Sequence, residues 1–265
     1  PAEKINIPQE RVPAMNLWQK HEVELLDKNS ISYRLVFEEA VAMPHLNKCV
    51  AAWRDSHNKP FPESDLAPHR VGVAHFYPYR RQMGAICCFP VTWAQYMLIS
   101  NGDVRETIPL EEHFRVLTVN CLVKTSDERF ALANRSKGLS HFGGMLHVSA
   151  AGNIDLHAAA ESRSPLVQCF VELQEELNVL PCDIRFIKQL ALAITLPRNS
   201  ATMEVCHYAE VALTSQELLE RTKTAKDSWE GKVSTFSETE TREMLETERF
   251  MPTGAATIML CFGIK

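Results

Sequence analysis

The clearest pattern of apolar and polar positions lies between residues 164 and 178. Four apolar residues recur there at spacings of four, three and four: Leu166, Phe170, Leu173 and Leu177. At about 100° per residue this spacing gives one apolar stripe along a helix. Ser164 is a good N-cap, and Pro165 suits the first helical position, where no amide donor is needed. The pattern therefore predicts a helix over 165–177.

The rest of the chain predicts strands with interposed helices. Apolar and β-branched runs indicate strands at 30–37, 114–124, 129–135, 184–195 and 203–214. Helical spacing indicates helices at 13–27, 38–55, 91–98 and 215–226, with two more in the remainder. The strands at 114–124 and 129–135 form a predicted hairpin. This mixture indicates an α/β or α+β protein, with a boundary near Pro109.

Composition narrows the classes of function. The 265 residues carry a formal net charge of −5, which argues against bulk nucleic-acid binding. No apolar run approaches the ~18 residues that span a bilayer, and the first residues lack the layout of a signal peptide. The 8 cysteines include no CxxC pair, so buried reduced thiols are expected. We therefore expect a cytoplasmic protein with no membrane partner.

Three carboxylates crowd one face of the predicted helix. Glu172, Glu175 and Glu176 fall within an arc of about 100°. The carboxylates repel one another unless they point into water or share a hard cation such as Mg²⁺. Spacing alone leaves both interpretations open.

Two segments resemble a known motif. The run ELQEELNV at 172–179 resembles the second half of the Nudix box, REUxEExGU, and AGNIDL at 151–156 resembles the turn that opens the box. The resemblance covers 114 to the C-terminus. It implies a Nudix-like α/β/α sandwich with a mixed sheet over 111–265. Residues 1–110 would form an α+β extension that shapes the substrate pocket or a homodimer interface.

The sequence departs from this motif in three places. Val171 stands where the family has an Arg that orients the first glutamate of the helix, and Asn178 replaces a Gly. The distance from Gly152 to Glu172 is longer than in the family, which implies an inserted segment within 157–164. The glutamate expected in the loop has two alternative counterparts, Asp155 and Glu161.

The resemblance implies hydrolysis of a diphosphate linked to another moiety. The substrate would be a small molecule such as a nucleotide-sugar, an ADP-ribose-like compound or an isoprenoid diphosphate. The implied cofactor is Mg²⁺, with Mn²⁺ as an alternative. The implied metal ligands are the three helix glutamates and the Gly152 carbonyl. Glu172 and Glu176, one turn apart, are the preferred pair.

Further residues complete this hypothesis. Glu175 and Glu176 are the predicted catalytic carboxylates, and Glu230, just before the expected last strand, is the candidate general base. Arg135 ends a predicted strand and could bind a phosphate through its planar guanidinium. A surface role remains an alternative for both Arg135 and Glu230.

The sequence leaves two alternative functions open. The departures at Val171 and Asn178 favour a Nudix-fold binding or regulatory module that has lost catalysis. An isoprenoid isomerase on the same fold ranks last, because no matching Cys and Glu motif is visible. The histidines at 141, 147 and 157 fit no zinc spacing, so packing or surface roles are expected for them.

Overall fold

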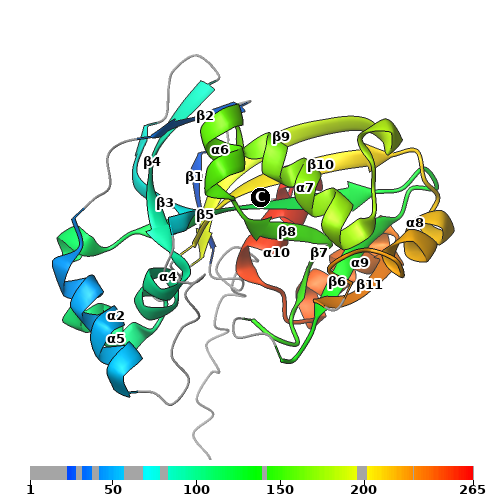
Figure 1. Ribbon diagram of the computed structural model, residues 1–265. Coiled ribbons are helices and arrows are strands. Elements are labelled where there is room, and N and C mark those ends of the chain that lie inside the picture. Colours follow the sequence, from blue (N-terminus) through cyan, green and yellow to red (C-terminus); the bar gives the residue numbers. More distant parts are fainter. Residues whose placement is uncertain are drawn as a thin grey trace, which may run out of the picture.

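The computed structural model describes residues 23–27, 32–37, 42–56, 68–77, 83–138, 142–195, 202–228 and 230–264. Its main feature is a mixed sheet that links eleven strands, with helices on both faces (Figure 1). None of the helices in the described ranges combines the length and apolar character that a membrane crossing requires.

The strands share one sheet through both parallel and antiparallel pairs. Their order is β1-β9-β10-β5-β3-β4-β2, while β8 and β6 also pair with β5, and β6 in turn pairs with β7 and β11. The strands are β1 (Val23–Asp27), β2 (Ser32–Phe37), β3 (Pro68–Tyr77), β4 (Met83–Thr92), β5 (Arg115–Lys124), β6 (Phe130–Arg135), β7 (Leu146–Val148), β8 (Ala150–Asn153), β9 (Ile184–Thr195), β10 (Thr202–Val211) and β11 (Gly231–Phe236).

Helices cover the sheet and its connections. The α-helices are α2 (Pro44–Ser56), α4 (Trp93–Ile99), α5 (Gly102–Thr107), α6 (Leu156–Ser162), α7 (Pro165–Leu177), α8 (Ser215–Thr222), α9 (Glu238–Thr247) and α10 (Pro252–Cys261), and two short 3₁₀ helices are η1 (Leu110–Glu112) and η2 (Pro181–Asp183). Most of the predicted elements from 114 onward are thus confirmed.

The central strand β5 explains the layered architecture. Its residues 116–123 are all buried, as expected for a strand with both faces covered. Val119 and Cys121 join the core under α7, whereas Leu122 points to the other face and joins the core under α10. The α/β/α fold class predicted from the sequence is confirmed.

The first part of the chain extends the same sheet. Strand β3 pairs with β5 through Gly72↔Val116 and Val73↔Arg115, and β4, α2 and α4 enclose a separate small core. The boundary near Pro109 falls just before η1. The division of the chain into domains at 1–110 and 111–265 stays a prediction. The proposed homodimer also stays a prediction.

The helix predicted over 13–27 is wrong at its C-terminal end. Residues 23–27 form the strand β1, which pairs antiparallel with β9 through Val23↔Thr195. Pairing with an available sheet edge outweighs weak helical spacing here. The remainder of that segment, 13–22, lies outside the described residues. The helix predicted over 38–55 is described as α2 from Pro44 onward.

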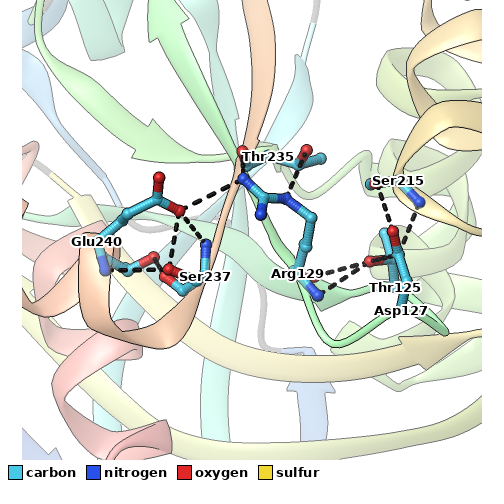
Figure 2. Close-up of polar contacts among 8 residues, drawn as sticks. Thr125, Asp127, Arg129, Ser215, Thr235, Ser237 and Glu240 are labelled. Carbon is cyan, nitrogen blue, oxygen red and sulfur yellow. Dashed lines mark hydrogen bonds and ion pairs between the residues drawn. The ribbon is translucent and has the colours of Figure 1, made fainter.

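A polar network fastens the β5–β6 turn to later elements (Figure 2). Asp127 accepts hydrogen bonds from the Ser215 backbone N–H at 2.8 Å and from its hydroxyl at 2.6 Å, at the first residue of α8. Arg129 donates to the Thr235 carbonyl on β11 at 2.8 Å and to Glu240 of α9 at 3.3 Å. The network helps to hold β11 beside β6.

Candidate active site

Helix α7 forms as the sequence predicts. The Ser164 side chain accepts a hydrogen bond from the Leu166 N–H, and Pro165 opens the helix. Leu173 and Leu177 are fully buried in the core. Asn178 ends the helix in the left-handed conformation at φ 54°, a conformation that Asn adopts more readily than most residues. The cap and the apolar stripe fix which face of α7 carries its glutamates.

Glu172 and Glu176 point from α7 onto strand β8. An added Cβ at Gly152 would lie 2.1 Å from Glu172 Oε1, so the Glu172 carboxylate occupies the space that a side chain would fill. Glu176 accepts a hydrogen bond from the Ala151 N–H at 3.1 Å. The structure therefore brings together Gly152, Glu172 and Glu176, which the sequence placed in one site.

Ladder geometry explains why the Ala151 amide is available to Glu176. The Ile154 N–H bonds the Leu117 carbonyl on β5, and alternate residues of an antiparallel strand point their backbone groups to opposite sides. Ala151, an odd number of residues away, therefore directs its N–H away from β5. By the same alternation, Gly152 directs its carbonyl toward Val119 on β5. A metal role for that carbonyl stays a prediction that this orientation does not favour.

Gln168 holds Glu172 in place. Its side-chain amide donates to Glu172 Oε1 at 2.7 Å, and its Oε1 accepts from the Asp155 backbone N–H at 3.1 Å. Gln168 lies one turn before Glu172 and is buried. It supplies an orienting hydrogen bond that the apolar side chain of Val171 cannot make.

Glu175 faces a different partner. Lys226 makes a charged hydrogen bond with Glu175, and the Asp227 N–H bonds the Glu175 carbonyl at 2.9 Å. The Lys226 side chain is 69% exposed, so the pair lies at the outer margin of the site. The structure thus separates Glu175 from the inward-facing pair formed by Glu172 and Glu176.

The inward carboxylates hold protons unusually tightly. Burial, opposed by the Gln168 hydrogen bond and reinforced by the charge of Glu175, raises the pKa of Glu172 to about 7. Burial and the nearby Glu172 charge raise the pKa of Glu176 well above its usual value. Crowded acids of this kind are typical of sites that bind cations or transfer protons.

Two inward carboxylates form the donor set that a divalent cation would use. Glu172 and Glu176 are oxygen donors of the kind that Mg²⁺ prefers. Their pKa values are raised first by burial and then by neighbouring carboxylates, and a cation would offset both effects. Within the described ranges, no group of three or more His, Cys, Asp or Glu side chains is close enough to hold a metal. The residues therefore fit a cation held by two carboxylates with additional oxygen ligands.

Glu176, the second glutamate of the inward pair, lines a cavity of about 760 Å³. Glu176, Glu230 and Asp227 bring acidic groups to its wall, and Arg135 and Lys223 bring basic ones. The described residues that line it lie between 133 and 234. A contribution of residues 1–110 to the substrate pocket therefore stays a prediction.

Glu230 and Arg135 meet where β11 runs beside β6. Glu230 immediately precedes β11, and its carbonyl accepts from the Ser136 N–H at 2.8 Å. Burial raises the pKa of Glu230, and the charge of Arg135 lowers it. The Arg135 Nε is buried without a hydrogen-bond partner in the described part of the chain. Both residues line the cavity. The sequence had left a surface role open as an alternative for each of them.

The inserted segment, the two candidate loop acids and the three histidines have the following positions in the structure. The inserted segment within 157–164 is largely helical, because α6 occupies Leu156–Ser162. Asp155 is half-buried and contacts Gln168 through its backbone, whereas Glu161 is exposed. His147 is buried, His157 is exposed, and His141 lies outside the described residues.

Sequence reasoning missed Gln168 and Lys226. A Gln on a helix carries no motif signal, and its partner at Asp155 is a backbone group. Lys226 lies 51 residues from Glu175, so only the folded structure brings the two together. The helix predicted over 215–226 would also have placed Lys226 on α8, which ends at Thr222.

Comparisons with known proteins concern the fold. No family model and no curated protein matches the chain. Among solved structures, it is similar to a putative Nudix hydrolase at 12% identity and TM-score 0.45, covering 73% of this chain and 99% of the other. It is also similar to a Deinococcus radiodurans protein at 16% identity and TM-score 0.39, covering 56% and 83%. A MutT protein from Methanosarcina mazei matches at 14% identity and TM-score 0.32, covering 54% and 91%. Two of these three bear Nudix or MutT names.

Proposed function

We propose that the protein is a Mg²⁺-dependent hydrolase that cleaves a diphosphate linked to another moiety. The observation that carries this proposal is the placement of Glu172 and Glu176 one turn apart on α7, with Glu176 lining a cavity that Arg135 and Glu230 also line. A cation site next to a guanidinium and a half-buried carboxylate suits a substrate with several negatively charged oxygens.

Glu172 and Glu176 would hold the cation. The motif implies the Gly152 carbonyl as a further ligand, although the β8–β5 ladder turns that carbonyl toward Val119. When bound, Mg²⁺ or Mn²⁺ polarises the phosphorus–oxygen bonds and offsets developing negative charge. Gln168 keeps the Glu172 carboxylate over Gly152, so that both glutamates present their oxygens on one side of α7.

Glu230 would act as the general base. Burial raises the pKa of Glu230 and so makes it a stronger base than an ordinary carboxylate. A water molecule loses its proton to the Glu230 carboxylate as its oxygen forms a bond with phosphorus, and the bridging oxygen leaves with its electron pair. Arg135 would hold the phosphoryl oxygens through its guanidinium during this displacement. The substrate moiety is a nucleotide-sugar, an ADP-ribose-like group or an isoprenoid.

A specific observation supports a second candidate, a binding module with weakened catalysis. Lys226 neutralises Glu175, and Glu172, with its pKa near 7, is partly protonated at neutral pH. A site of this kind could bind an anionic ligand without turnover. Glu175 remains a proposed catalytic or additional metal-binding group only if Lys226 releases it when the cation binds.

A phosphate-release screen with Mg²⁺ and Mn²⁺ tests the proposal over nucleotide-sugars, dinucleotides and prenyl diphosphates. Turnover of at least one compound, abolished by alanine at both Glu175 and Glu176, is the expected result. Undiminished turnover in that double variant would contradict the mechanism. Calorimetric binding without metal dependence or turnover would favour the binding module instead.

A further inference from the structure

The cavity contains polar groups that the proposed hydrolysis does not use. His147 and Ser149 both line it, with only 2% and 1% of their surfaces exposed. Both ring nitrogens of His147 and the hydroxyl of Ser149 lack a hydrogen-bond partner in the part of the chain that the structure describes. Buried polar groups are nearly always paired, so such a cluster points to a ligand.

Strand register explains why these groups converge. His147 lies opposite Ala133 in the antiparallel β6–β7 pair, and residues two apart on a strand share a face. Arg135 therefore lies on the same face of β6 as Ala133, and Ser149, at the bend between β7 and β8, lines the same cavity. Ala133 also lines the cavity.

The His147 ring is also fixed from the opposite side. At Gly254 of α10, an added Cβ would lie 2.2 Å from His147 Nδ1. Only a glycine there lets the ring lie against the helix backbone. Packing against Gly254 thus holds the ring in place, while its nitrogens have no hydrogen-bond partner among the described residues. Those nitrogens are therefore available to a ligand.

We propose that His147, Ser149 and Arg135 form a site on the cavity wall that binds phosphoryl oxygens. His147 and Ser149 would supply neutral hydrogen-bond donors, and Arg135 would supply a positively charged guanidinium. The inference rests on the proposed function, because it assigns these residues to the phosphate groups of that substrate. Burial, with the charge of Arg135, lowers the pKa of His147 to about 3. A neutral imidazole donates one hydrogen bond from its protonated nitrogen, and the Ser149 hydroxyl donates another.

The probe is methylenediphosphonate, whose P–C–P bridge cannot be hydrolysed, titrated by calorimetry in EDTA and again in Mg²⁺. We expect His147→Ala and Ser149→Ala each to weaken binding about tenfold, the size of a lost hydrogen bond to a charged group. His147→Gln, which keeps one side-chain donor, should recover part of the loss. His157→Ala, at an exposed histidine on α6, is the matched control and should bind as the wild type does.

A second readout protects against a variant that fails to fold. Correlation spectra of the histidine ring nitrogens in the wild-type protein should show the His147 resonances shift as the probe is added, while those of His157 stay unchanged. Unchanged His147 resonances, or His147→Ala and Ser149→Ala variants that fold and bind normally, would overturn the inference. No binding to the wild type in either buffer would overturn it as well.

These outcomes separate the inference from the proposed function. If the wild type hydrolyses a diphosphate while His147→Ala binds the probe normally, the assignment of His147 fails and the hydrolase stands. If the probe binds through His147 but no diphosphate is turned over, the hydrolase fails and the phosphoryl site stands.

Discussion

The Gln168 side-chain amide donates a 2.7 Å hydrogen bond to the Glu172 carboxylate one turn further along α7. Gln168 is itself held by the Asp155 backbone N–H, so the loop after β8 sets the position of the glutamate. This chain therefore orients its first helix carboxylate without an arginine at position 171.

Replacing Gln168 with Ala should lower the Mg²⁺-dependent turnover about 10–100-fold, the usual cost of losing a partner that orients a metal ligand. The Glu172 carboxylate would keep its charge but lose its fixed position. The measurement is kcat against Mg²⁺ concentration, where we expect a higher Mg²⁺ requirement. Gln174→Ala, at an exposed position of the same helix, should behave as the wild type does. Equal Mg²⁺ curves for the two variants would show that Gln168 does not position Glu172.

Gly152→Ala should separate activity from stability. The new Cβ would meet the end of the flexible Glu172 side chain at 2.1 Å, so the carboxylate must swing away while the backbone stays in place. We expect hydrolysis to fall at least about tenfold, with a loss in unfolding free energy of no more than about 1.5 kcal/mol. Turnover assays and urea unfolding measure the two effects. Gly138→Ala meets nothing within 4 Å and should change neither. Normal turnover in Gly152→Ala would contradict the position of Glu172.

The contact between Asp127 and α8 should make part of the stability depend on pH. Hydrogen bonds from Ser215 and Thr125 lower the pKa of Asp127 from 3.8 to about 2. The unfolded chain therefore binds this proton more tightly, so the stabilisation is present above about pH 4 and is lost as the pH falls toward 2. Asp127→Asn should cost about 1 kcal/mol at pH 7, as for a lost helix cap.

The difference between wild type and Asp127→Asn in urea unfolding should shrink steadily between pH 4 and the lowest pH at which both proteins fold. Glu243→Gln, at an exposed residue of α9, controls for the loss of one negative charge. A difference that stays constant over this range, or that also appears in Glu243→Gln, would show that the Asp127 contact is not responsible.

The sequence predicts α7 and its end at Asn178 well, because caps and an apolar stripe are local signals. It also predicts that Gly152, Glu172 and Glu176 belong together, through the spacing of a motif. It does not predict β1, whose strand state comes from pairing with β9. The Lys226–Glu175 contact and the burial of His147 are equally hidden, since both depend on segments far apart in the chain. Tertiary contacts, rather than local propensity, decide these features.

The most direct test of the central claim compares Glu176→Gln with Glu175→Gln on a diphosphate that the wild type hydrolyses, at saturating Mg²⁺. Glu176 lines the cavity, whereas Glu175 pairs with the exposed Lys226. We predict that kcat falls about 100-fold or more in Glu176→Gln and stays within about tenfold of the wild type in Glu175→Gln. An undiminished kcat in a folded Glu176→Gln variant would contradict the assignment of the inward pair of carboxylates as the hydrolytic centre.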